Sequence, residues 1–303
     1  MKADKHLERQ WSLMASLVKR DITQRYRGSI FGMVWAFLLP LMLLAVYSFV
    51  FRMVFAAKWD QLSNTATGST SVALFNMLPD GLHFAANLFI GLIVFSIFAE
   101  VIGRSPKLIL EQPHLVRRVV FPLPLLGAVL TVSAIANALF QWVVLVVALL
   151  LGAVVFPSLQ SGSASGSVFV AIDASWLQWA VLQVPLSLVV LLCLVPLLLG
   201  FTWTLSALGA YFRDLSYLTP PLMSMLMFLG PVFYPTSSLP EPYRGWVVMN
   251  PLTIIAEQLR FVLMQGTAPN WSQLCAYTMV GIVFAMFGLW FFRRVQAGFS
   301  DVI

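Results

Sequence analysis

The sequence predicts an all-α membrane protein with six transmembrane helices, an amphipathic helix before the first of them, and a re-entrant helical hairpin between spans five and six. Of the 303 residues, 60% are hydrophobic and only 10% are charged, whereas a soluble domain carries about 25% charged residues. The mean hydropathy is +0.88, and runs of about 20 apolar residues recur along the chain. These observations exclude a soluble globular protein.

Six apolar runs define the expected spans. They lie near residues 33–55, 82–102, 125–155, 177–208, 218–233 and 274–292. The third and fourth runs exceed one bilayer thickness, so we expect them to tilt or to extend past the membrane, or Pro185 and Pro196 to kink the fourth. Glu100 and Arg104, at the end of the second span, are expected to pair because they are four residues apart on one helix.

The basic residues orient these spans. With the N-terminus in the cytoplasm, every lysine and arginine falls on the cytoplasmic side except Arg52, Lys58, Arg244 and Arg260, as the positive-inside rule requires. Six spans then place both termini in the cytoplasm, whereas a seventh crossing would put Arg293 and Arg294 outside. The formal net charge of +6 is therefore a topology signal, and no nucleic-acid partner is expected.

Residues 1–32 form the first of two expected regions, and residues 33–303 form the transmembrane domain. Leu7, Trp11, Met14 and Val18 recur at helical spacing, which favours a cytoplasmic helix lying on the inner leaflet with Trp11 at headgroup depth. The alternative is a solvated basic tail. The arginines that follow indicate topology and anionic-lipid contact, and Gly28 and Gly32 permit a bend from this helix into the first span.

Two cytoplasmic loops are candidates for contact with a soluble partner. The first, residues 103–122, interleaves Lys107 and Glu111 with apolar residues and is broken at Pro113, which predicts short amphipathic turns. An ordinary basic loop is the alternative, since the positive-inside rule alone explains its charges. The second, residues 211–215, places adjacent opposite charges between aromatic residues and predicts a compact turn.

Residues 228–265 are interrupted by too many prolines for one spanning helix and are too apolar for an ordinary exposed loop. We interpret them as two short helices that dip into the membrane and return, because irregular backbone at membrane depth is tolerated where protein or water surrounds it. A proline-rich connection on the membrane surface is the alternative. Glu257 and Arg260 are three residues apart and are expected to pair, stabilising the hairpin against its neighbour; they would otherwise line the exit of a pore.

The chain lacks the residues of a catalytic or metal site. No G-x-x-x-x-G-K-[ST] motif is present, Cys193 and Cys275 lie within apolar runs, and His6, His83 and His114 are isolated in sequence. We therefore expect no catalytic residue, no metal ligand and no cofactor bound by this chain. Any energy for transport must enter from elsewhere, through the two cytoplasmic loops.

Four segments together carry a family resemblance. They are LVKRDITQRYRGSIFGMVWAFLLPL before and within span one, LVRRVVFPLPLL entering span three, YFRDLSYL between spans four and five, and GPVFYP followed by NPLT, Glu257 and Arg260. In this order they resemble the permease subunit of type-two ABC exporters, most of all those that export O-antigen, capsule or teichoic acid. The likeness covers nearly the whole chain, and the long polar segments after span one and between spans three and four depart from it.

The resemblance implies a homodimer bound to two copies of a separate ABC ATPase subunit, which would bind ATP and Mg²⁺. It implies a bacterial inner-membrane location, contact with membrane lipid and a lipid-linked glycan as substrate. The coupling contacts would be Arg104, Lys107, Glu111, Arg117, Arg118, Tyr211, Phe212, Arg213 and Asp214. Substrate would enter near Arg25, Tyr26, Arg27, Gly28 and Trp35. The outer gate and channel would involve Phe228, Phe233, Tyr234, Tyr243, Trp246, Glu257 and Arg260.

Two other functions stay open on the sequence alone. One is a type-two ABC permease that exports a drug or another small lipid-like molecule. The other is an integral membrane enzyme acting on lipid-linked sugars, which would need acids or histidines gathered at one membrane face. The sequence does not offer such a gathering.

Overall fold

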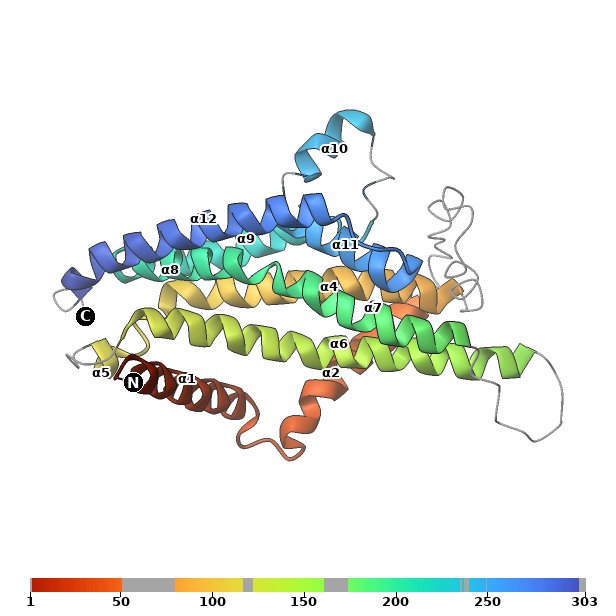
Figure 1. Ribbon diagram of the computed structural model, residues 1–303, viewed down its shortest axis with the longest axis horizontal. Helices are drawn as coiled ribbons and strands as arrows, with labels where there is room; N and C mark the ends of the chain where they lie inside the picture. The colour runs from red at the N-terminus through yellow and green to blue at the C-terminus, as the bar shows by residue number, and fades with distance from the viewer. Residues whose placement is uncertain are drawn as a thin grey trace.

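The computed structural model describes residues 2–50, 80–116, 122–160, 174–234, 236, 240–248 and 250–299. Within these ranges all regular structure is helical, with no strand, which confirms the predicted all-α class. The long helices lie side by side along one axis of the molecule (Figure 1). A bundle of this kind satisfies the backbone hydrogen bonds within each helix, as a bilayer requires.

Five of the described segments are long and apolar enough to cross a membrane: Gly32–Phe49, Leu82–Lys107, Pro124–Gly152, Trp179–Tyr211 and Trp271–Gly298. They confirm five of the expected spans. The helices that carry them are α2 (Trp35–Phe49), α4 (Asp80–Arg104), α6 (Pro124–Gln160), α7 (Ala174–Leu192), α8 (Val195–Tyr211) and α12 (Trp271–Val295). The last residues expected in the first span lie outside the described residues.

The expected fifth span is shorter than the others. Helix α9 covers Leu215–Leu229 and ends where Gly230 takes an extended conformation, immediately before Pro231. Its 15 residues are about 22 Å long at the α-helical rise, against a hydrocarbon core of about 30 Å. The helix is about as long as the expected run of residues 218–233, but it begins three residues earlier and ends at Leu229; a full crossing by α9 stays a prediction.

The long fourth run is broken into two helices. Helix α7 ends at Leu192 and α8 begins at Val195, with Pro196 near its start. Proline has no backbone N–H to continue the hydrogen-bond ladder of the preceding turn, and the Leu194 N–H instead bonds to the Leu191 carbonyl at 3.2 Å. The expected kink is confirmed at Pro196, while Pro185 lies inside α7.

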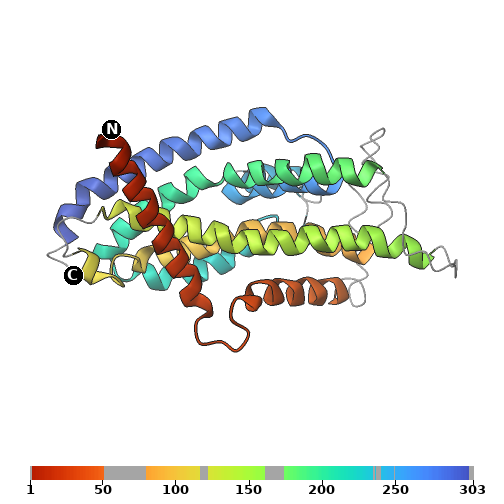
Figure 2. The ribbon, with the colours of Figure 1, turned by 60° about the horizontal axis from the view of Figure 1, so that its bottom comes forward.

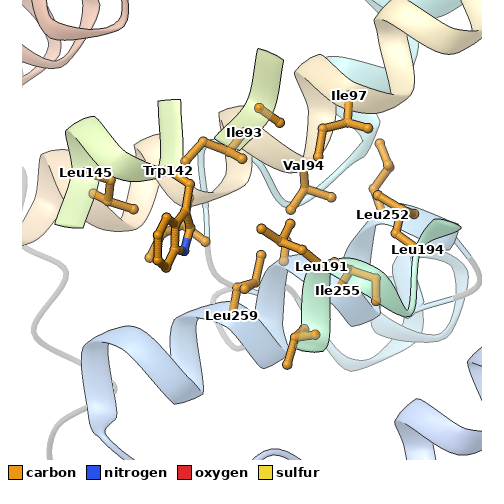
Figure 3. Close-up of a cluster of buried hydrophobic side chains, with 14 of the residues drawn as sticks. Ile93, Val94, Ile97, Trp142, Leu145, Leu191, Leu194, Leu252, Ile255 and Leu259 are labelled. Carbon is orange, nitrogen blue, oxygen red and sulfur yellow. The ribbon is translucent and has the colours of Figure 1, made fainter. Parts of the chain in front are cut away.

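The main core joins α4, α6, α7, α8 and α11 (Pro251–Gln265). Figure 3 shows side chains from these elements converging, including Val94, Trp142, Leu191 and Ile255. Lipid tails are as apolar as leucine, so close packing rather than the hydrophobic effect holds helices together in a bilayer. Glycines provide such packing between α8 and α12: a Cβ at Gly288 would lie 2.7 Å from the Gly200 carbonyl oxygen.

Helix α1 (Lys2–Tyr26) crosses the bundle at a steep angle to its long helices (Figure 2). Trp11, expected to face the membrane, is 65% exposed, and a half-buried face of the helix carries Leu13, Met14, Leu17, Val18 and Ile22. Packing against α6 selects this face. The placement of α1 on the inner leaflet stays a prediction, and the exposed Trp11 suits it.

The chain turns from α1 into α2 through the expected bend. Gly28 and Gly32 have φ angles of +88° and +50°, in the left-handed region where glycine carries no steric cost. The short 3₁₀ helix η1 (Gly32–Val34) completes the turn. Ile30 and Phe31 on this bend are exposed apolar side chains.

The expected hairpin contains two short helices, α10 (Glu241–Val248) and α11. Asn250 caps α11 by accepting a hydrogen bond from the Leu252 N–H at 3.0 Å, and Gly266 ends it with φ of +62°. Helix α11 packs within the bundle, whereas α10 projects from it (Figure 1). Re-entry of this segment into a bilayer stays a prediction.

The side of the membrane that α10 faces can be tested with a cysteine at Gly245, where an added Cβ meets nothing within 4 Å. In a background with Cys193→Ala and Cys275→Ser, we expect Gly245→Cys to react with an impermeant maleimide added outside spheroplasts. Asp214→Cys, in the turn between α8 and α9, is expected to react only in inside-out vesicles. Labelling of Gly245→Cys from the cytoplasmic side alone would reverse the topology.

Candidate functional site

The two predicted cytoplasmic loops meet at one end of the bundle. The 3₁₀ helix η4 (Ser105–Lys107) follows α4 and packs against α8. The approach is so close that a Cβ at Gly209 would lie 2.2 Å from the Pro106 carbonyl oxygen. The second loop, residues 211–215, begins two residues later and overlaps the end of α8. The structure therefore brings together both loops proposed to meet a soluble partner.

The first loop has a buried side and an exposed side. Leu108 and Ile109 pack into a second core cluster with Phe292 and Phe299, while Lys107 and Glu111 are exposed. The short helix α5 (Pro113–Val116) follows. Arg117 and Arg118 lie outside the described residues. The loop therefore buries its apolar side chains and exposes its charged ones, as the predicted amphipathic turns require.

The second loop presents aromatic and charged side chains. Phe212 is 66% exposed, and Arg213 and Asp214 are exposed beside it. Tyr211 has a structural contact that the sequence does not show: its hydroxyl donates to the Val295 carbonyl at 3.1 Å, and its ring lies 5.9 Å from that of Phe299. Tyr211 thus ties this turn to the end of α12.

An ionic cluster joins α1 to α4 beside these loops. Arg104 donates two hydrogen bonds to the Asp21 carboxylate, from Nη2 to Oδ1 at 2.7 Å and from Nη1 to Oδ2 at 3.2 Å. Arg104 also pairs with Glu100 at 3.3 Å, which confirms the expected pair on α4. Arg25 contacts Asp21 at 3.4 Å and also pairs with Glu100. We call Asp21, Arg25, Glu100 and Arg104 the ionic cluster.

Helix α6 contributes a polar link to the same cluster. The Asn137 amide donates to Glu100 Oε2 at 3.3 Å, and Asn137 Oδ1 accepts from the Tyr26 hydroxyl at 3.2 Å. Each carboxylate of the cluster therefore contacts both arginines, and Glu100 also contacts Asn137. Charge-assisted and bidentate hydrogen bonds are the stronger kind, and a network of them contributes more than isolated surface pairs do.

The cluster favours the charged forms of Asp21 and Arg25. Burial alone raises the pKa of the Asp21 carboxyl, but the hydrogen bond from Arg104 and the charges of Arg104 and Arg25 outweigh it, so this pKa lies below its usual value. Burial lowers the pKa of Arg25, and its contacts with Glu100 and Asp21 more than compensate, so this pKa is raised. A depressed carboxyl pKa means that the stabilisation is present at neutral pH and is lost only as pH falls through that pKa.

Two of the residues predicted to contact substrate or the ATPase belong to the ionic cluster. Arg25, expected where substrate enters, and Arg104, expected to contact the ATPase, are both engaged with carboxylates. Arg27 is exposed beside the glycine bend, and the Trp35 ring packs edge-on against Phe31 with centroids 5.7 Å apart. Sequence reasoning missed Asp21, although its spacing of four residues from Arg25 was a signal.

A second charged site fixes α11 inside the bundle. Arg260 is only 4% exposed and pairs with Glu257 at 3.5 Å, as its spacing predicts. Its Nε donates to the Asn87 carbonyl at 3.2 Å, and its Nη2 donates to the Val232 carbonyl at 3.0 Å. Glu257 in turn accepts from the Thr236 N–H at 3.2 Å.

Gly91 on α4 makes room for this arrangement, because a Cβ there would lie 2.8 Å from Arg260 Nη2 and 2.9 Å from the Val232 carbonyl oxygen. Arg260 thus joins three parts of the chain: α4, α11 and the segment that follows α9. This supports the interpretation that the pair stabilises the hairpin against its neighbour.

The model of a known protein family matches most of this chain. The ABC-2 type transporter family is matched over residues 12–264, which includes the ionic cluster, both predicted cytoplasmic loops and Arg260. The chain belongs to the ABC-2 type transporter family. It is accordingly a multi-pass permease of the type-two ABC exporter class, and this class implies an ATPase partner.

Relatives of this ABC-2 permease align along nearly the full length. It is 25% identical over 293 residues to an O-antigen export system permease protein from Myxococcus xanthus, covering 96% of this chain and 95% of the relative. Two O-antigen export system permease proteins from Klebsiella pneumoniae are 20% and 21% identical, each covering 97% of this chain and 95% of the relative.

The aromatic residues expected at the outer gate of the permease lie on and around α9 and α10. Phe228 stacks on Phe233 with centroids 5.9 Å apart, and Phe233 packs against the small cluster of Phe84 and Leu88. The Tyr234 hydroxyl donates to the Phe228 and Leu229 carbonyls, each at 3.2 Å. Trp246 on α10 is 78% exposed. Tyr243 is also on α10, and its side chain lies outside the described part.

Proposed function

We propose that this chain is the membrane-spanning subunit of an ATP-driven exporter that moves lipid-linked polysaccharide from the cytoplasmic side across the bacterial inner membrane. The observation that carries this proposal is the near full-length alignment with the three O-antigen export permeases. The family match independently supports the transport machinery, and the relatives support the substrate class.

The working assembly in this proposal is a homodimer with two separate ABC ATPase subunits, which bind ATP and Mg²⁺. The ATPase subunits dock at the end of the bundle where η4 packs against α8. An exposed aromatic side chain, Phe212, lies there beside Arg213 and Asp214, and aromatic residues and arginine are enriched in protein interfaces.

The glycan passes the outer aromatic residues on its way out. Sugar rings stack their apolar faces on aromatic rings much as aromatic rings stack on one another. Exposed Phe228 and Trp246 offer such surfaces. The lipid carrier enters from the inner leaflet beside the Gly28 bend, where Arg27 is exposed and suits the phosphate groups of a lipid carrier.

Deletion of the gene tests this function. We expect lipid-linked glycan to accumulate on the cytoplasmic face of the inner membrane while the cell surface loses the polymer. The gene together with its ATPase partner restores export, whereas the same gene with an ATPase partner unable to hydrolyse ATP does not. Normal surface glycan after deletion, or accumulation of a drug-like or other small molecule instead, would refute the proposed substrate.

A further inference from the structure

The ionic cluster lies where a cytoplasmic loop and the N-terminal helix meet. Arg104 is the last residue of α4, and η4 begins at the next residue. Asp21 and Arg25 belong to the final turns of α1. The cluster therefore joins the loop expected to receive the ATPase to the helix that precedes the first span.

The connection between Arg104 and the loop is rigid. Ser105 and Pro106 are buried, the Ser105 hydroxyl bonds to the Val101 carbonyl, and Gly209 of α8 packs directly on Pro106. A displacement of η4 must therefore displace Arg104 with it. Packed elements of this kind move as units rather than deforming continuously.

Helix α1 otherwise packs on α6, to which the Tyr26 hydroxyl donates a hydrogen bond at Asn137. Its apolar residues facing α6 are only half-buried, and its next segment turns at Gly28 and Gly32, both with positive φ. The cluster links α1 to the end of α4, with two hydrogen bonds from Arg104 to Asp21. Its two carboxylates and two guanidinium groups balance in charge, so it is a joint between elements and not a site for an anion.

We propose that the ionic cluster makes α1 follow η4, so that movement of the loop by the ATPase is passed through Asp21 and Arg104 to α1 and, across the glycine bend, to α2. These are positioning residues, and the proposal rests on the proposed function. It identifies α1 as a moving part of the transport cycle. Without the cluster, the ATPase still binds and hydrolyses ATP, but that hydrolysis no longer drives export.

Exchanging the charges of Asp21 and Arg104 distinguishes a coupling role of the cluster from a direct contact between Arg104 and the ATPase. In the complete complex, Asp21→Arg and Arg104→Asp alone are each expected to reduce export roughly tenfold or more, with complex formation and ATP hydrolysis retained. The double variant again has one positive and one negative side chain at positions 21 and 104, with the charges exchanged, and it is expected to restore export. An ATPase contact made by Arg104 itself would not be rescued by a change at Asp21.

Arg20→Asp is the matched control. Arg20 is exposed on α1, one residue before Asp21, and lies outside the cluster. Its substitution changes the net charge by the same amount as Arg104→Asp, so export close to the wild-type level is expected. Wild-type export by both single variants would overturn the proposal, and so would failure of the double variant to recover.

A distance measurement makes the test independent of the substrate. With spin labels at Gln24→Cys on α1 and Lys107→Cys on η4, in the cysteine-free background, the distance is expected to stay fixed when ATP binds the complex. Adding Asp21→Arg is expected to make that distance shift or broaden. A change on ATP binding with the cluster intact, or an unchanged distance in the Asp21→Arg variant, would contradict the coupling. If the complex exports no glycan, the proposed function fails while this measurement still decides the role of the cluster.

Discussion

Arg260→Met is expected to reduce export roughly tenfold or more and to lower the yield of folded permease. The substitution leaves Glu257 without the cation it pairs with at 3.5 Å and removes the donors to two backbone carbonyls. Breaking a buried ion pair by removing one partner costs about 3–5 kcal/mol, which is a large share of the ~5–15 kcal/mol that stabilises a typical protein. Export and detergent-extracted folded protein are measured together.

Two further variants sharpen this result. Arg260→Lys keeps the charge but cannot direct a planar fork at two carbonyls, so an intermediate loss is expected. Arg20→Met removes an exposed arginine and is expected to export and fold as the wild type does. If Arg260→Met matched that control in both measurements, the role of Arg260 in holding α11 would be refuted.

Gly209→Val is expected to abolish stable association with the ATPase subunit. The added Cβ would lie 2.2 Å from the Pro106 carbonyl oxygen and 2.5 Å from its Cα, so either α8 or η4 has to move. Overpacking costs roughly 1–3 kcal/mol or more, and here the displaced backbone carries both loops proposed to meet the ATPase. Co-purification of the ATPase with the variant measures the effect.

Gly103→Ala provides the comparison for that variant. Gly103 lies on α4 just before η4, but an added Cβ there meets nothing within 4 Å, and alanine favours a helix more than glycine does. We expect Gly103→Ala to retain the ATPase subunit fully. Equal retention by Gly209→Val would show that the contact between α8 and η4 does not shape the docking surface.

Much of the bundle could be predicted because the bilayer sets the length of its elements. A run of about 20 apolar residues has one stable conformation in lipid, a spanning helix, and this fixed α4, α6 and α12 in advance. The break between α7 and α8 near Pro196 could also be predicted, because proline has no backbone N–H. The end of α9 was harder to predict, because the apolar run continues past Gly230, the residue that follows the last turn of the helix.

The ionic cluster could not be predicted from local spacing. Pairs four residues apart on one helix, such as Glu100 and Arg104, are visible in the sequence, but Arg25 and Glu100 are separated by 75 residues. Their contact depends on the angle at which α1 crosses the bundle (Figure 2). The same packing decides that Leu13 and Leu17, rather than Trp11, face the bundle.

The central claim is that this permease moves lipid-linked glycan with energy supplied by a separate ATPase subunit. The most direct measurement is transport in proteoliposomes that contain the purified permease, the ATPase subunit and lipid-linked glycan. We expect ATP-dependent movement of glycan across the bilayer only when both proteins are present, and no ATP hydrolysis by the permease alone. ATP hydrolysis by this chain unaided, or glycan movement that does not require the ATPase subunit, would contradict it.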